Sequence, residues 1–203
     1  MNARVITMVV AGAALGLAAA FLLLPQARER MFPLPEPTVS GKALIGGPFS
    51  LIDGTGKRVT EQTYRGRYTL VFFGFTSCPD VCPAGLQLMS AALEKIGPKA
   101  DRITPLFITL DPERDTPEKV ASYVKNFNPR IVGLSGTPGD IASVAKAYRV
   151  YYQKVPTEGG APGNYSLDHS SIIYLMDPKG EYVTHFTPTT TVEQLTAGLD
   201  KNL

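Results

Sequence analysis

The sequence contains very little cysteine and histidine, and it has no cluster of basic residues. Cys78 and Cys82 are its only cysteines, and His169 and His185 are its only histidines. No cysteine lies near the apolar N-terminus, which excludes a bacterial lipoprotein anchor there. The formal net charge is +2, without any basic run, so nothing in the composition predicts binding to nucleic acid.

The N-terminus consists of an apolar segment followed by a proline-rich one. Val5 to Leu24 carries no charged side chain, and a helix of that length spans roughly 30 Å, the thickness of a hydrocarbon core. We therefore expect a membrane anchor over 1–25, a semi-rigid linker over 26–40 with three prolines, and a folded domain over 41–203. A cleaved signal peptide is the alternative, and either interpretation exports the domain.

The hydrophobic pattern of the remaining chain alternates between strand-like and helix-like segments. We predict a hairpin over 47–60, strands over 69–75, 103–110, 131–134 and 150–155, helices over 84–96, from 115 onward and around 141–148, a strand pair over 171–176 and 182–186, and a last helix near 192–199. This order is typical of an α/β fold of the thioredoxin-like type, with a mixed sheet flanked by helices and an N-terminal β-hairpin.

The two cysteines lie in the run Thr76 to Pro83, between a predicted strand and a predicted helix. Pro79 and Pro83 each disfavour helical geometry in the preceding cysteine, so we expect the regular helix to begin at Pro83. Both thiols then sit at the positive end of a helix, where the thiolate form is favoured. Such a pair can form a disulfide or chelate one ion. An inert structural disulfide is less attractive, because so short a loop stabilises weakly.

His169 is the candidate for a third ligand. It precedes a predicted buried strand, and in a thioredoxin-like fold the loop entering that strand faces the cysteine turn. Redox members usually have a proline there, whereas the nearest downstream proline here is Pro178, which argues against a plain disulfide reductase. His185 lies within a predicted strand and is expected to be a surface or satisfied residue.

Two sulfurs and one imidazole suit Cu(I) and tolerate Cu(II) with a weak further ligand. Zn(II) would require a firm fourth ligand, and none is evident. Asp80 and Asp168 could orient a ligand or a partner, although turn formation and solvation explain them equally well. Met89 and Met176 fall on apolar positions and are expected in the core.

Three motifs carry a family resemblance. The segment from Phe72 to Pro83, the segment from Asp111 to Pro117, and Asp168-His169-Ser170 resemble the signature of the Sco/SenC family. The resemblance extends from about Gly47 to the C-terminus. It implies a membrane-tethered copper protein that assembles the CuA centre of a cytochrome c oxidase subunit, with Cys78, Cys82 and His169 as copper ligands. In the second motif, helix capping explains Asp115 to Pro117, and a loop ion pair would explain Asp111 and Arg114.

Three functions are compatible with these residues. The first is a copper chaperone that binds copper through Cys78, Cys82 and His169 and delivers it to the CuA site. The second is a thiol–disulfide oxidoreductase in which Cys78 and Cys82 form a redox-active pair that reduces the CuA cysteines. The third, a peroxiredoxin-like peroxidase acting through Cys78, ranks last. The expected partners are the CuA-bearing subunit and other copper chaperones or thiol reductants. The expected location is the inner membrane, single-pass, with the domain in the periplasm or an equivalent exported compartment.

Overall fold

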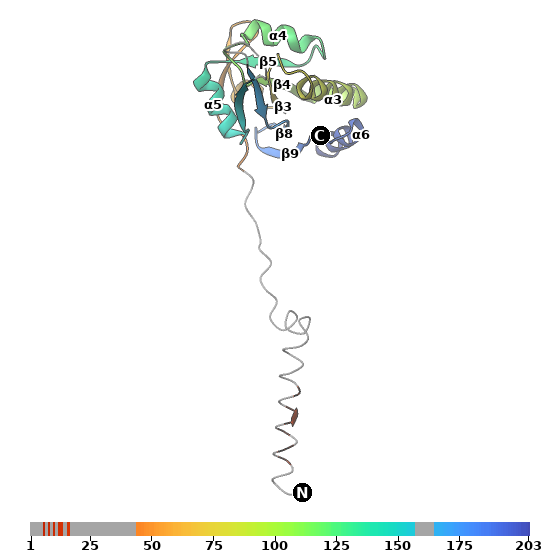
Figure 1. Ribbon diagram of the computed structural model, residues 1–203. Coiled ribbons are helices and arrows are strands. Elements are labelled where there is room, and N and C mark those ends of the chain that lie inside the picture. Colours follow the sequence, from red (N-terminus) through yellow and green to blue (C-terminus); the bar gives the residue numbers. More distant parts are fainter. Residues whose placement is uncertain are drawn as a thin grey trace. The chain divides into compact units, whose positions relative to one another are not determined.

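The computed structural model describes residues 44–156 and 165–203, together with six isolated helical positions between 6 and 16. The chain divides into two units between Lys42 and Ala43, and the C-terminal unit forms the folded domain drawn with labelled helices and strands in Figure 1. The predicted linker over 26–40 and most of the predicted anchor over 1–25 lie outside the described residues. Among the described residues, no helix has both the length and the apolar character needed to cross a bilayer.

The domain is built on a mixed seven-stranded sheet with the order β2-β1-β5-β4-β3-β8-β9. β3 is parallel to β4 and β4 to β5, whereas β8 and β9 add antiparallel strands beyond β3. The expected N-terminal hairpin is present as β1 and β2, which pair antiparallel. The strands of this sheet are β1 (Ser50–Asp53), β2 (Arg58–Thr60), β3 (Tyr68–Gly74), β4 (Ile103–Thr109), β5 (Val132–Ser135), β8 (Ile173–Met176) and β9 (Tyr182–Phe186).

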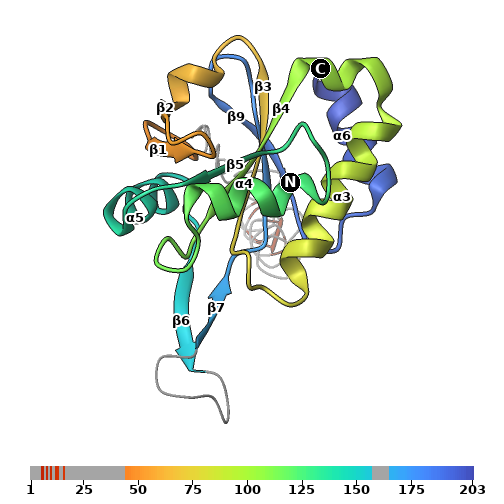
Figure 2. The ribbon, with the colours of Figure 1, turned by 90° about the horizontal axis from the view of Figure 1, so that it is seen from above.

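Helices cover both faces of the sheet, as a thioredoxin-like fold requires (Figure 2). On one face α3 packs against α6, and the ring of Tyr123 from α4 lies 5.8 Å from that of Phe107 on β4. On the other face the ring of Tyr148, which caps α5, lies 5.2 Å from that of Phe73. The helices are α3 (Val81–Lys95), α4 (Pro117–Lys125), α5 (Pro138–Ala147) and α6 (Val192–Asn202), with 3-10 turns at η1 (Glu61–Tyr64) and η2 (Gly97–Arg102).

The centre of the domain is apolar because β3 and β4 are buried on both faces. From Thr69 to Gly74 every side chain of β3 is buried, and the aromatic residues of β3 alternate between the two helix layers. Phe72 faces α3, where Gly85 permits the close approach, since a Cβ there would lie 2.6 Å from the Phe72 ring. This rigid centre fixes the end of β3, from which the cysteine turn departs.

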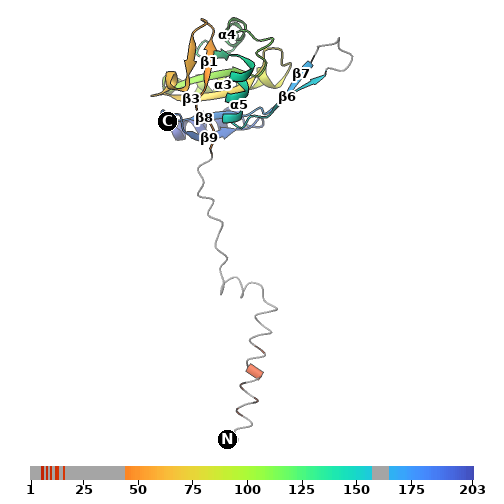
Figure 3. The ribbon, with the colours of Figure 1, turned by 90° about the vertical axis from the view of Figure 1, so that its left-hand side faces the viewer.

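A second, two-stranded sheet was predicted only in part. β6 (Tyr152–Pro156) pairs antiparallel with β7 (Tyr165–His169) and projects from the body of the domain (Figure 3). The predicted strand over 150–155 corresponds to β6, whereas the segment that we expected to be a loop entering β8 is strand β7. The expectation was wrong because only Leu167 of β7 is buried, so the segment lacks the apolar pattern by which a strand is recognised.

The start of α3 also differs from the prediction. The helix begins at Val81 rather than at Pro83, so Cys82 lies in its first turn and Asp80 is the N-cap. Pro83 is tolerated inside this turn because the first amide groups of a helix have no intrahelical acceptor. The preference of a residue before proline for extended geometry is therefore overridden at Cys82.

Candidate metal centre

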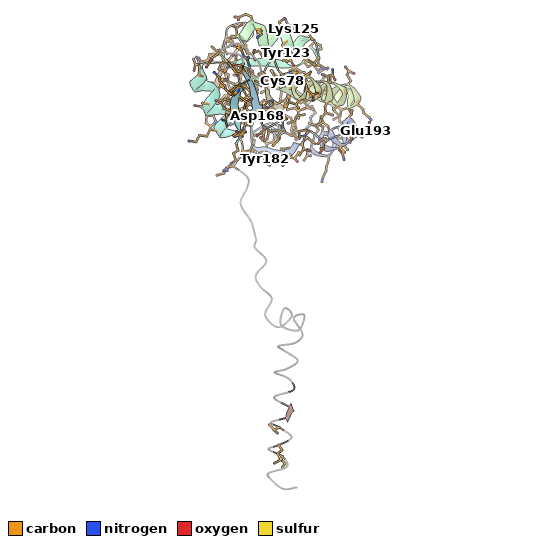
Figure 4. All side chains as sticks on the ribbon, viewed as in Figure 1. Cys78, Tyr123, Lys125, Asp168, Tyr182 and Glu193 are labelled. Carbon is orange, nitrogen blue, oxygen red and sulfur yellow. The ribbon has the colours of Figure 1, made fainter. Side chains whose placement is uncertain are left out.

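The two sulfur atoms lie where β3 passes into α3. Cys78 is in the connecting turn, and its amide donates to the carbonyl of Phe75 at 3.2 Å. Its Sγ accepts a hydrogen bond from the amide of Cys82 at 3.3 Å, so the sulfur occupies the place of an acceptor at the helix N-terminus. Both cysteines are reduced and buried, and Figure 4 shows Cys78 within the packed side chains of the domain. The helix start thus provides a pre-formed pair of thiols.

His169, the last residue of β7, completes the group. Its Nε2 atom lies 3.4 Å from Sγ of Cys82, and its Nδ1 atom lies 3.2 Å from the carbonyl oxygen of Ser170. Since a carbonyl can only accept, Nδ1 carries the proton and the lone pair of Nε2 faces the sulfur. The ring also meets Phe75 edge-on, at 5.8 Å between centroids. These contacts orient the imidazole for coordination.

The structure therefore brings together the three donors that the sequence singled out, although they come from distant parts of the chain. Sγ of Cys78, Sγ of Cys82 and a ring nitrogen of His169 all lie within 4.8 Å of one another. No aspartate, glutamate or further histidine of the described residues joins this group. His185 is exposed on β9, where its Nδ1 atom is 2.6 Å from the hydroxyl of Tyr182.

The donor set determines which ion fits. Two thiolates and one imidazole form a soft, low-coordinate site, which suits Cu(I) and admits Cu(II) with a weak further ligand. A structural Zn(II) site would need four firm protein ligands, and the described residues supply three. The residues therefore fit copper better than zinc.

The two thiols differ in acidity. The contact with Cys82 lowers the pKa of Cys78 to about 5, and backbone amides at the helix start act in the same direction. The neighbouring Cys78 sulfur and burial raise the pKa of Cys82. Cys78 is therefore the thiolate at neutral pH, whereas Cys82 loses its proton when a cation replaces it.

Asp115 supports the turn that carries Cys78 through hydrogen bonds. The expectation that Asp115 only belongs to a helix cap did not predict this role. The N-cap of α4 is Thr116, and Asp115 is fully buried instead. Its carboxylate accepts hydrogen bonds from the amide of Thr76 at 2.8 Å and from the hydroxyl of Thr109 at 2.8 Å, and it pairs with Lys119 at 3.1 Å. The turn that carries Cys78 is therefore tied to β4 and α4.

Asp111 and Arg114 hold the hairpin that carries the histidine. They form the expected ion pair, but their contacts extend further than the predicted loop pair. The hydroxyl of Tyr165 donates to Asp111 at 2.7 Å, and Arg114 donates to the backbone carbonyl of Tyr165 at 2.8 Å and stacks on its ring. Sequence reasoning missed Tyr165 because its strand was not predicted.

The other residues that the sequence singled out, two methionines and two aspartates, lie outside the group of three donors. Met89 and Met176 are buried in the core, as predicted. Asp80 and Asp168 are exposed beside the ligands, and none of the hydrogen bonds or ion pairs found among the described residues involves either carboxylate. Neither residue therefore orients a ligand through a direct bond.

The model of the SCO1/SenC family matches residues 37–203. This chain belongs to the SCO1/SenC family. The matched range includes Cys78, Cys82 and His169.

Individual proteins and solved structures of the same family are also similar to this chain. The chain is 47% identical over 165 residues to the mitochondrial protein SCO1 homolog 1 of Arabidopsis thaliana, covering 81% of this chain and 48% of that protein. It is 48% identical over 148 residues to the human mitochondrial SCO1 homolog, covering 72% of this chain and 48% of that protein. The chain thus spans about half the length of these relatives. The copper-bound structure of ScoI from Bradyrhizobium japonicum is 47% identical and covers 78% of this chain and 99% of that one, with a TM-score of 0.71.

Proposed function

We propose that this protein is a copper chaperone, which binds copper through Cys78, Cys82 and His169 and delivers it to the CuA site of cytochrome c oxidase. The observation that carries the proposal is the convergence of the three donor atoms within 4.8 Å. The copper held by the relative from Bradyrhizobium japonicum and the family's role in oxidase assembly support it.

Transfer would proceed by exchange of ligands, with copper as the cargo. A thiolate of the acceptor forms a bond to copper while the bond to one of the chaperone's sulfurs breaks, and the oxidation state of the metal does not change. The released sulfur of Cys82 takes up a proton, because its raised pKa favours the thiol. The lowered pKa of Cys78 allows its thiolate to persist without metal.

The proposed setting is a domain tethered to the inner membrane by the predicted anchor over 1–25, facing the periplasm or an equivalent compartment. The apolar run from Val5 to Leu24 supports this proposal, as does the mitochondrial location named for the relatives. The linker over 26–40 would give the domain reach toward a membrane-bound oxidase subunit.

Metal loading of the reduced protein tests the proposal. Wild type should bind stoichiometric copper, whereas Cys78→Ser, Cys82→Ser and His169→Ala should each lose or strongly weaken it, because each variant removes one of the three donors and lowers the affinity of the site for copper. His185→Ala is the matched control, since His185 is the exposed histidine of β9, and it should load like wild type. Full copper binding by His169→Ala would overturn the proposed ligand set.

A second function is favoured by the unequal acidity of the two thiols. With its pKa lowered to about 5, Cys78 is a ready nucleophile toward a partner disulfide, and Cys82 lies close enough to resolve the mixed disulfide. Cys78 and Cys82 become a disulfide, and the CuA cysteines of the partner gain two electrons together with two protons, one from the thiol of Cys82 and one from water. The protein would then act as a thiol–disulfide oxidoreductase.

The two functions separate in one experiment. Reduced, copper-free protein is mixed with an oxidised CuA domain in the presence of a copper chelator, and free thiols are counted on both proteins. Reduction of the domain by wild type and by His169→Ala alike would establish the oxidoreductase. Failure to reduce it, with copper transfer intact when the chelator is omitted, would leave the chaperone function alone.

A further inference from the structure

Two surface hollows lie next to the three donor residues and share part of their lining. The first, here called the helix hollow, measures about 290 Å³ and lies between the start of α3 and the loop from Thr187 to Thr190. The second, the histidine hollow, measures about 370 Å³ and is lined by His169 and its neighbours. Val81 and Ser171 line both, so the two hollows adjoin, and together they are here called the groove.

The helix hollow has an apolar floor. Phe72 and Ile173 are the buried residues beneath it, and Leu88 of α3 forms part of its wall. Val81 is 43% exposed and Tyr151 in the histidine hollow is 59% exposed. Isolated exposed apolar residues are ordinary, but these two flank the histidine along the same groove, which is typical of an interaction site.

Each hollow also carries one carboxylate. Asp80 lines the helix hollow and Asp168 lines the histidine hollow. Among the residues that the structure describes, neither carboxylate takes part in a hydrogen bond or ion pair, whereas Asp111 and Asp115, which support the histidine hairpin and the cysteine turn, are both paired. The groove therefore combines apolar surface with negative charge that lacks a counter-charge.

The burial of the ligands determines the direction from which an acceptor can reach them. Cys82 is fully buried and Cys78 is 8% exposed, while His169 is partly exposed and opens into the histidine hollow. An acceptor sulfur that reaches the metal beside His169 would therefore enter through this hollow. A polypeptide that occupies both hollows would contact Val81, which lines both, and would lie near both carboxylates.

We propose that this groove is the docking site for the metal-receiving segment of the copper acceptor. The segment places an apolar side chain in the helix hollow and a basic side chain between Asp80 and Asp168, and its thiolate reaches the metal beside His169. The charge of the groove selects a basic segment, and the apolar floor anchors it. This inference rests on the proposed function, because it names the surface by which the acceptor is bound.

The test measures complex formation and copper transfer separately. The probe is a soluble, reduced, metal-free CuA domain of a cytochrome c oxidase subunit, titrated against copper-loaded protein. Val81→Ser should weaken the complex by about tenfold, because an apolar side chain loses its burial. Asp80→Asn combined with Asp168→Asn should slow association by about tenfold at low salt, and the difference should shrink at high salt.

Two matched variants serve as controls. Glu94→Gln removes an acidic group from the far end of the same helix, and Leu44→Ser removes an apolar side chain that is 79% exposed outside the groove. Both should bind the CuA domain like wild type. Copper content is measured for every variant, so that a loss of metal is distinguished from a loss of docking.

The outcomes are separable. Groove variants that hold copper normally but bind the domain and transfer copper more slowly support the docking site. Groove variants that bind and transfer like wild type overturn the docking site and leave the chaperone function intact. Absence of any complex between wild type and the CuA domain overturns the docking proposal, and a wild type that holds no copper overturns the proposed function itself.

Discussion

The carboxylate of Asp115 accepts a hydrogen bond from the backbone amide of Thr76 at 2.8 Å, two residues before the first cysteine. Asp115 is fully buried, and the charge of its carboxylate is compensated by hydrogen bonds from Thr76 and Thr109 and by the ion pair with Lys119. The sulfur of Cys78 is thereby held by a charged group that does not touch the metal site. Disturbing this group should change both the stability of the fold and the retention of copper.

We expect Asp115→Ala to destabilise the protein by about 3 kcal/mol, because Thr76 and Thr109 lose a charged acceptor in the interior. Asp115→Asn should cost less, since the amide oxygen still accepts. Urea unfolding measures the free energy, and copper dissociation should be faster in both variants. Asp101→Ala is the control: its pair with Arg130 is exposed, so it should cost at most about 1 kcal/mol. Equal effects at the two aspartates would contradict this role of Asp115.

Gly74, the last residue of β3, leaves the space that the second sulfur occupies. A Cβ at this position would lie 2.7 Å from Sγ of Cys82 and 2.9 Å from the ring of Phe107. Because Phe107 is fully buried, we expect Gly74→Ala to displace the sulfur, to destabilise by about 1–3 kcal/mol and to lower copper affinity. Competition with a copper chelator measures the affinity.

Gly139→Ala provides the matched control for this substitution. Gly139 lies in α5, where the nearest atom to an added Cβ is 3.8 Å away. This variant should keep the copper affinity of wild type and be at least as stable, because alanine favours the helix. If Gly74→Ala bound copper as tightly as wild type, the position of the Cys82 sulfur would not determine the copper affinity.

The sequence predicted the sheet and the cysteine pair of the candidate site, because both leave strong patterns. The apolar runs that became β3 and β4 could only be buried strands, and a cysteine pair at a strand-to-helix junction indicates chemistry in any fold. His169 could be singled out only from the cysteine pair and the expected topology, to which the family resemblance was then added, because a single histidine carries no periodic signal.

The supports of the site could not be predicted in the same way. Asp115 precedes Thr116 and Pro117 in a typical helix start, so a local explanation concealed its long-range contact with Thr76. Tyr165 lies in a strand with one buried residue, which hydrophobic periodicity cannot detect. The unexplained pair Asp111 and Arg114 was the available signal, since a buried ion pair in a loop requires further partners.

Arg114 should control how firmly the hairpin holds His169. Its side chain donates to the carbonyl of Tyr165 and stacks on that ring at 3.8 Å, and Tyr165 is at the opposite end of β7 from the histidine. We expect Arg114→Ala to loosen β7 and to speed copper release by about tenfold or more, since a partly buried charged hydrogen bond and its stacking are lost. Hydrogen exchange of the β7 amides provides the structural measurement.

Lys154→Ala is the control on the same hairpin. Lys154 pairs with Glu113 on the surface at 2.7 Å, and its Nζ atom also lies 4.5 Å from the centre of the Tyr165 ring, but it makes no hydrogen bond to the backbone of β7 through its side chain. Exposed contacts of this kind contribute little. Copper release and β7 exchange should therefore match wild type. If Lys154→Ala and Arg114→Ala accelerate release equally, the hydrogen bond from Arg114 to the carbonyl of Tyr165 is not what holds the hairpin.

The difference in pKa between the thiols of Cys78 and Cys82 should produce different rates of alkylation. With a pKa of about 5, against an ordinary value of 9.0, Cys78 should react with iodoacetamide at neutral pH, and its rate should fall as the pH drops through about 5. Cys82 should remain unmodified because it is buried and its pKa is raised. In urea both thiols should titrate near 9. A midpoint near 9 for Cys78 in the folded protein would contradict the role of the helix start.

The same shift makes the stability of the reduced, metal-free protein depend on pH. Between about pH 5 and pH 9, Cys78 is a thiolate in the folded protein and a thiol in the unfolded chain, so unfolding takes up a proton and stability rises with pH. This contribution is fully present above pH 9 and is lost as the pH falls through about 5. The raised pKa of Cys82 acts only above pH 9. Urea unfolding across this range should therefore show a slope in wild type that Cys78→Ser removes.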